Sequence, residues 1–133
     1  MKFMNSLNFK AEIENLYEIN NIILSQLNTN NKNTKDLELI IEEIFVNIVK
    51  YSNADCIKIN YSYNAKTSIF NIEFIDNGIM FNPLEHEDYS KKEDLDSTPV
   101  GGLGIFFFKS LSDNISYEYK NNENHLFISK IIK

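Results

Sequence analysis

A glutamate and an asparagine one helical turn apart form the first candidate site. Glu43 and Asn47 lie in residues 34–52, where apolar residues recur at intervals of three and four and predict a helix. This spacing places the carboxylate and the carboxamide on one face of that helix. A carboxamide oxygen suits Mg²⁺, and a nearby carboxylate can act as a general base. The structural alternative is that Glu43 pairs with Lys50 or Lys66 and that Asn47 ties a loop in place.

An aspartate at the end of an apolar strand forms the second candidate site. Asp76 follows the predicted strand 70–75 and is itself followed by Asn77 and Gly78. Such a sequence is often only a turn. The functional alternative is a carboxylate that accepts a hydrogen bond from an amino group of a flat ligand. Gly78 would then let the backbone approach that ligand closely.

A glycine-rich stretch at the start of a predicted third helix, residues 104–111, forms the third candidate site. Average usage would give about nine glycines in a chain of this length. This chain has four, and three of them lie in Gly101-Gly102-Leu103-Gly104. The free N–H groups and the positive end of a helix attract anions, and glycine lets a phosphate approach. The stretch is not a P-loop, because no Gly-Lys-Ser/Thr follows, and no buried strand precedes it directly, as a dinucleotide fingerprint requires.

The elements that must position these residues are helices and strands in irregular order. A first helix is predicted over 11–27, and Asn33 with Asp36 is predicted to cap the second. Further along the chain the apolar residues alternate with polar ones, which predicts strands near 57–63, 70–75, 114–120 and 125–132. Residues 2–9 are a further strand candidate with only two apolar side chains to support it. Because β-α-β alternation is missing, we predict an α+β fold with a mixed, largely antiparallel sheet.

Composition excludes several classes of protein. With 133 residues and 43% hydrophobic content, the chain predicts a single domain, residues 1–133, with a true core. The net charge of −6 and the lack of a basic patch argue against a nucleic-acid partner. No apolar run reaches the ~20 residues of a membrane span, and the first residues lack a signal-peptide core, so we expect a cytoplasmic protein without membrane partners. The single cysteine, Cys56, cannot form an intrachain disulfide and is expected to be buried.

Residues 77–100 show no periodicity, and their end carries many acidic side chains. A long structureless segment inside a compact domain favours a functional lid, here residues 82–100, over a solvated loop. His86 lies there, and with only His125 elsewhere no histidine cluster for a metal exists. Residues 106–108, three phenylalanines, are predicted to be core, with one ring left for a dimer interface.

Together, in this order and spacing, the three stretches resemble the Bergerat-type nucleotide pocket of the GHKL ATPases. Glu43 to Asn47 is similar to the family's N box, Asp76-Asn77-Gly78 to its first glycine box, and residues 101–104 to its second. Within that superfamily, the chain is most similar to the anti-sigma-factor serine kinases of the RsbW and SpoIIAB type. The resemblance spans nearly the whole chain and implies a two-layer α/β sandwich with helices on one face of the sheet.

The resemblance also implies an ATP·Mg²⁺ site and a role for each residue. Asn47 would ligate the magnesium that bridges the phosphates, and Glu43 would orient or deprotonate the attacking hydroxyl. Asp76 would accept from the adenine amino group, with Gly78 beneath the ring. The phosphates would be held by Gly101, Gly102, Leu103 and Gly104.

The partners implied by the resemblance are proteins. The phosphate acceptor would be a serine on an anti-sigma-factor antagonist, a sigma factor would be the alternative partner, and a homodimer is compatible with the family. The other open reading is an ATP-gated binding module of the same fold without phosphoryl transfer. Because a pure binding module needs no base, Glu43 favours the kinase.

Three features depart from the family pattern. Met80 stands where broader members have a second glycine. A threonine that many relatives carry near the adenine has no clear counterpart, and its place stays unassigned among Asn124, His125 and Ser129. Arginine is absent, so transition-state charge would be met by Mg²⁺, by the lysines at 91–92 or by a partner.

Overall fold

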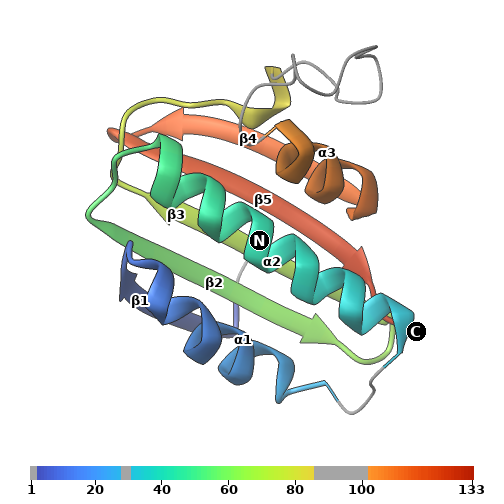
Figure 1. Ribbon diagram of the computed structural model, residues 1–133. Helices are drawn as coiled ribbons and strands as arrows, with labels where there is room; N and C mark the ends of the chain where they lie inside the picture. The colour runs from blue at the N-terminus through green and yellow to red at the C-terminus, as the bar shows by residue number, and fades with distance from the viewer. Residues whose placement is uncertain (1–2, 28–30, 86–101) are drawn as a thin grey trace.

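The computed structural model describes residues 3–27, 31–85 and 102–133. Its elements in chain order (Figure 1) are β1 (Asn5–Lys10), η1 (Ile13–Asn15), α1 (Leu16–Leu24), α2 (Lys32–Tyr51), β2 (Cys56–Asn64), β3 (Ile69–Asp76), η2 (Pro83–Glu85), α3 (Gly102–Leu111), β4 (Asn114–Lys120) and β5 (Glu123–Ile131). In the ranges just given, no helix combines the length and the apolar character needed to cross a membrane.

The elements form two layers, with the helices over one face of a five-stranded sheet (Figure 1). The strand order is β1-β2-β3-β5-β4, and all four neighbouring pairs are antiparallel. The predicted α+β class and the helical cover on one face are confirmed. The expected mixture of pairings is not found among the described strands. The tight turns within β2–β3 and β4–β5 are compatible only with antiparallel neighbours.

Helix α2 lies across the middle of the sheet, with α1 on one side and α3 on the other (Figure 1). Its buried apolar residues follow the predicted stripe and include Leu37, Ile40, Ile41, Ile44, Phe45 and Ile48. The strands meet this stripe with every second residue, among them Ile57, Ile59, Phe70, Ile72, Phe74, Leu126 and Ile128. The helical stripe of α2 and the alternating apolar residues of the strands therefore pack against each other in one core.

Two local predictions are wrong. Helix α2 is capped by Asn31, whose side chain accepts from the Thr34 N–H at 3.2 Å, and not by Asn33. Asn33 lies inside the first turn, where its amide donates to the Lys133 carbonyl at 3.3 Å. Cys56 is exposed, because the next residue points into the core and alternation along β2 turns Cys56 to the other face.

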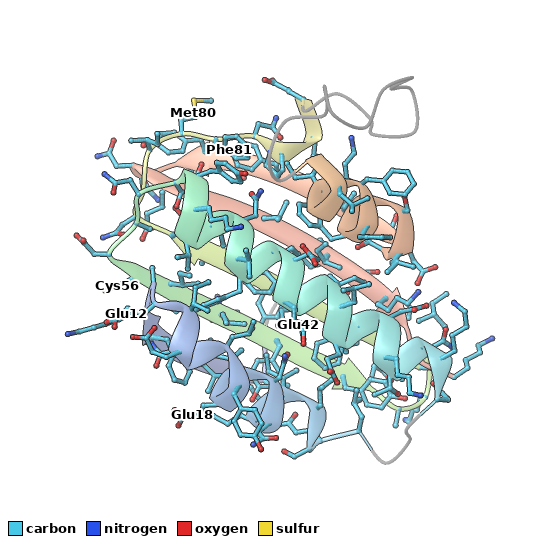
Figure 2. All side chains as sticks on the ribbon, viewed as in Figure 1. Glu12, Glu18, Glu42, Cys56, Met80 and Phe81 are labelled. Carbon is cyan, nitrogen blue, oxygen red and sulfur yellow. The ribbon has the colours of Figure 1, made fainter. Side chains whose placement is uncertain are left out.

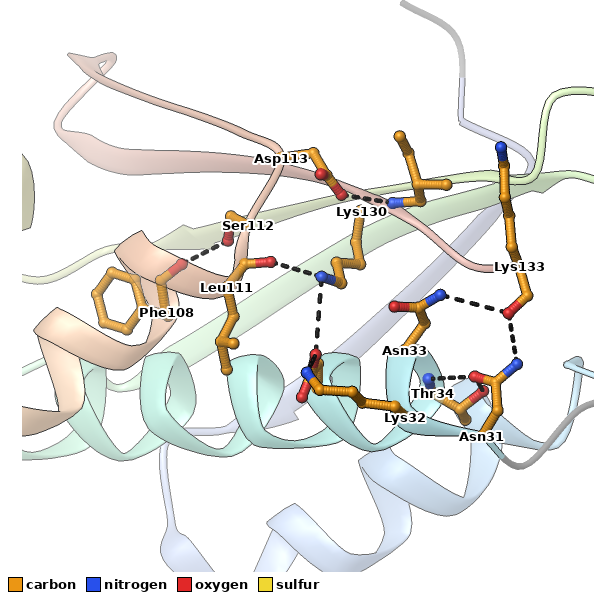
Figure 3. A network of polar contacts seen from close by, with 12 residues as sticks. Asn31, Lys32, Asn33, Thr34, Phe108, Leu111, Ser112, Asp113, Lys130 and Lys133 are labelled. Carbon is orange, nitrogen blue, oxygen red and sulfur yellow. Dashed lines mark hydrogen bonds and ion pairs between the residues drawn. The ribbon is translucent and has the colours of Figure 1, made fainter.

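A polar network ties the end of β5 to two helices (Figure 3). The buried Lys130 donates to the Leu111 carbonyl at 2.7 Å and lies 3.9 Å from the Asp36 carboxylate. A cation at the carboxyl end of a helix satisfies an orphan carbonyl and complements the helix dipole. Lys130 therefore fixes α3, whose other end carries Gly104, against α2.

Most of the predicted lid lies outside the described residues. Of residues 82–100 only 82–85 are described, and they form η2 after Asn82. Gly101, His86 and the two lysines at 91–92 fall in the part that is not described.

Candidate functional site

Two adjoining hollows bring four of the eight predicted site residues together: Glu43, Asn47, Asp76 and Gly104. The first, which we call the α2–α3 hollow, has a free volume of about 50 Å³ and is lined by Glu43, Val46, Asn47, Lys50, Tyr51 and Gly104. The second, which we call the β3–β5 hollow, has about 20 Å³ and is lined by Ile44, Asn47, Ile48, Ser52, Asp76, Phe81, Pro83, Tyr117, Asn124 and Leu126. Asn47 lines both hollows, so the two are neighbours along one face of α2.

In the α2–α3 hollow, the first turn of α3 lies directly against the Glu43 side chain. A Cβ atom built on Gly104 would lie 2.4 Å from Glu43 Oε2, closer than any real contact. Glycine at this position therefore leaves the Glu43 carboxylate beside the amino end of a helix. That end presents backbone N–H groups and a positive dipole, which favour anions. Gly102 begins the same helix, and Leu103 in its first turn is 43% exposed.

Lys50 adds a cation to the α2–α3 hollow that the motif analysis missed. The sequence suggested Lys50 only as an ion-pair partner of Glu43. The structure places it on the same wall as Asn47, three residues along α2. The available signal was the i, i+3 spacing from Asn47, which keeps both side chains on one face. Because the hollow combines a carboxylate, a carboxamide, a lysine and a helix start, it suits a phosphate group with a bound cation.

In the β3–β5 hollow, Asp76 is buried and oriented by its neighbours. Its Oδ1 atom accepts from the Gly78 N–H at 2.9 Å and from Asn124 Nδ2 at 3.0 Å. Among the hydrogen bonds of the described residues, both donors go to Oδ1 and none goes to the other oxygen, Oδ2. A fixed carboxylate with one free acceptor can recognise an amino group at the edge of a flat ring. The apolar side chains of Ile48 and Leu126 supply surface for the ring itself.

Asn124 is the one of the three unassigned candidates that lies beside Asp76. Antiparallel register pairs it with Asp76 across β3 and β5. Besides donating to Asp76, its amide donates to the Ile79 carbonyl at 2.8 Å, and its Oδ1 accepts from the Phe81 N–H at 3.0 Å. The Tyr117 hydroxyl also donates to Oδ1. Asn124 thus holds the segment after the first glycine box over the hollow.

The other two candidates for that place lie elsewhere. His125 and Ser129 alternate with Asn124 along β5 and so belong to the face without helices. His125 contacts carboxylates there, with its ring nitrogens 3.8 Å from Glu73 and 3.8 Å from Glu123. Only knowledge of the β3–β5 pairing separates Asn124 from its neighbours.

Gly78 is required by packing at the end of α2. A Cβ atom at this position would lie 2.1 Å from the Ser52 carbonyl oxygen, and the next residue, Ile79, donates its N–H to that same oxygen at 2.7 Å. This contact by itself explains the glycine, and the predicted place beneath an adenine ring stays a prediction.

Aromatic side chains close the β3–β5 hollow. The Phe81 ring stacks on Tyr51, with centroids 5.9 Å apart and an interplanar angle of 18°. Burial raises the pKa of the Tyr117 hydroxyl; a hydrogen bond with the Phe81 backbone lowers this pKa in part, and the Asp76 carboxylate raises it. Tyr117 therefore keeps its proton and acts as a donor to Asn124. Figure 2 shows Phe81 beneath the loop, while Met80 projects away from it and is 65% exposed.

Comparison with known proteins identifies the class of protein that this fold and site define. The profile of the histidine kinase-like ATPase domain family matches residues 9–130. The chain belongs to this family, and the GHKL resemblance is confirmed at that level. Membership implies an ATP-binding domain of a regulatory kind. The anti-sigma branch remains a prediction.

Two solved structures share the fold. The Acinetobacter baumannii histidine kinase AdeS is 13% identical, with 100% of this chain and 70% of that chain covered and a TM-score of 0.52. The mycobacterial sensor histidine kinase MprB is also 13% identical, with 95% and 97% covered and a TM-score of 0.53. At this identity the likeness shows the fold alone. A search of curated proteins finds no match.

Proposed function

We propose that this chain is a cytoplasmic anti-sigma regulatory factor that uses ATP and Mg²⁺ to phosphorylate a serine of an antagonist protein and that sequesters a sigma factor. The observation that carries the kinase proposal is the Glu43 carboxylate against Gly104, on the same wall as Asn47 and Lys50. A base, a metal ligand and a cation meet there at a helix start. The sigma factor and the antagonist come from the sequence resemblance.

The donor types around both hollows fit ATP with a magnesium ion. Asp76 Oδ2 would accept from the adenine amino group. Asn47, which lines both hollows, would ligate the metal, and Lys50 with the start of α3 would hold the phosphates. Magnesium, when bound, neutralises phosphate charge and fixes the phosphate geometry. The β3–β5 hollow has room for about one water molecule. The adenine ring can therefore enter only when Phe81 or Pro83 moves outward.

In the proposed reaction, Glu43 accepts the proton of the serine hydroxyl as the serine oxygen bonds to the γ-phosphorus. The bond from that phosphorus to the bridging oxygen breaks, and ADP leaves with the electron pair. Positioning and electrostatics supply most of the acceleration in phosphoryl transfer. A positioned base adds about 10²–10⁴-fold.

Replacing Glu43 by Gln tests the kinase proposal. Glu43→Gln keeps the shape and removes the basicity, so ATP should bind normally while transfer slows by about 10²-fold or more. The measurement is transfer of labelled phosphate to small proteins that co-purify with the chain. Glu12→Gln, outside both hollows, is the matched control. Equal rates in wild type and Glu43→Gln would exclude the base role.

The binding-module alternative is separated in the same assay. Tight ATP-dependent binding of a partner, without transfer to it, would favour the ATP-gated module over the kinase.

Two further variants, Asp76→Asn and Lys50→Met, test the two ends of the proposed nucleotide site by calorimetry. Asp76→Asn should reduce the preference for ATP over GTP, whose ring carries a carbonyl in place of the amino group. Lys50→Met should weaken the binding of ATP more than the binding of adenosine, because only the phosphates would contact the lysine.

A further inference from the structure

A groove lies between α1 and α2, on the opposite side of α2 from the candidate site. Glu42 faces this groove and accepts from the Asn20 amide of α1 at 3.4 Å, whereas the next residue, Glu43, contacts Gly104 of α3. Successive helical residues are about 100° apart, which turns the two carboxylates to different neighbours. The groove has a volume of about 550 Å³ and is lined by Leu16, Tyr17, Asn20, Asn21, Leu24, Ser25, Glu38 and Glu42.

The charge of the groove lining is uniformly negative. Its described lining carries two carboxylates, those of Glu38 and Glu42, and no lysine. Partial burial raises the pKa of Glu42, and repulsion from Glu38 and then Glu43 raises it further. Figure 2 shows Glu42 in the space between the two helices and Glu18 on the far side of α1. A cation seated between Glu38 and Glu42 would relieve this repulsion.

The rest of the lining suits an apolar side chain next to that cation. Leu16 and Leu24 contribute apolar surface, and Tyr17 stands at the rim with 77% of its surface exposed. Exposed tyrosines are frequent anchors of protein interfaces. In the described part of the chain, Asn20 Oδ1 on the same wall finds no hydrogen-bond donor. The groove therefore offers apolar surface and two carboxylates.

We propose that this groove docks a segment of a partner protein that presents a lysine or arginine beside an apolar side chain. A second copy of the chain is a poor occupant, because a two-fold interface over this groove would bring the Glu38 and Glu42 carboxylates of both copies into one interface. The chain as a whole carries a charge of −6, which also favours a basic partner. This docking surface goes beyond the proposed ATP chemistry and needs neither Glu43 nor Asp76.

The probe for the test is a synthetic 15-residue peptide with leucines and lysines at helical spacing, titrated into the isotope-labelled chain. We expect amide shifts confined to residues 16–25 and 38–42. Glu38→Gln with Glu42→Gln should weaken binding by about fivefold to tenfold, as the loss of two charge pairs near the surface would. Glu14→Gln with Glu18→Gln removes the same charge outside the lining and should change binding by less than about twofold.

Two further arms separate docking from surface electrostatics. Replacing every leucine of the peptide by serine keeps its charge and should weaken binding. Tyr17→Ser, at an exposed rim position that leaves folding unaffected, should weaken the leucine peptide as well. Equal binding of both peptides, equal loss in the two double variants, or shifts centred on the α2–α3 hollow would each overturn the proposal. So would the absence of binding by the leucine-lysine peptide.

Discussion

The two hollows that share Asn47 are built in different ways. The β3–β5 hollow is lined largely by apolar side chains and is held together by hydrogen bonds, with Asn124 joining Asp76, Ile79 and Phe81. The α2–α3 hollow is made of longer side chains, with Glu43 and Lys50 on one helix facing the start of another. The β3–β5 hollow, with its buried hydrogen bonds, can select a ring by shape and hydrogen bonding. A half made of charged side chains can adapt to phosphates during a reaction.

Gly78, which follows Asp76, and Gly104, which lines the α2–α3 hollow, also differ in what surrounds them. A methyl group on Gly78 would meet a backbone carbonyl at 2.1 Å, whereas on Gly104 it would meet the end of a side chain at 2.4 Å. A backbone carbonyl at a helix end cannot rotate away, but a glutamate can. One residue type thus serves folding at the first position and the arrangement of the site at the second.

The largest effect is expected for Gly78→Ala. Overpacking of a fixed neighbour costs about 1–3 kcal/mol, and the Ser52 carbonyl leaves little room for relief, so we expect the free energy of unfolding to fall by about 3 kcal/mol. Urea unfolding measures this loss. A loss below about 1 kcal/mol would show that the turn after β3 yields easily and would remove the contrast with Gly104.

Asn124→Ala should have the next largest effect. The change leaves the buried Asp76 carboxylate with one donor fewer, and it takes one donor from the Ile79 carbonyl and one acceptor from the Phe81 N–H. Unsatisfied buried groups cost about 1–3 kcal/mol, so we expect a loss of about 2 kcal/mol in urea unfolding. Asn114→Ala, at an exposed position of β4, is the control and should change stability by less than about 0.5 kcal/mol.

Gly104→Ala sharpens the comparison by changing the site while sparing the fold. Alanine favours a helix by about 1 kcal/mol over glycine, which offsets the cost of moving the Glu43 side chain, so the net change should stay below about 1 kcal/mol. Phosphoryl transfer should nevertheless fall with the displaced carboxylate. Urea unfolding and the phosphate-transfer assay are measured on the same variant. A loss of stability as large as that of Gly78→Ala would contradict the prediction.

The smallest effect is a pH dependence that reports the charge of Glu43. The pKa of Glu42 is raised above 4.5 by burial, then by Glu38, then by Glu43. The folded state therefore holds more protons than the unfolded state just above pH 4.5, and this group's contribution makes stability fall as pH rises through that window. Glu43→Gln should shrink the fall slightly and Glu38→Gln should shrink it more. Thermal unfolding from pH 4 to 7 measures the slopes, and Glu14→Gln should leave them unchanged.

Much of the fold follows from periodicity in the sequence. The stripe through Ile40, Ile44 and Ile48 and the alternation through Ile57 and Ile59 each depend on residues close in sequence, and both predict the observed elements. The cap of α2 was misplaced because several asparagines stand near its start and any of them could accept from an early N–H. The structure begins the helix at Lys32, so Asn31 with its extended backbone is the residue whose side chain reaches the Thr34 N–H.

The sequence by itself determined the type of the helices and strands and the order of the three motifs, because helix and strand periods and glycine spacing are local properties. Only the tertiary structure decided that Asn124 meets Asp76, that Glu43 meets Gly104, and that Lys50 joins Asn47 at one hollow. The Asn124–Asp76 and Glu43–Gly104 pairs join residues far apart in the chain. Lys50 and Asn47 line one hollow only because α3 packs beside them. Strand register and helix packing fix these contacts, and both are set by the whole core at once.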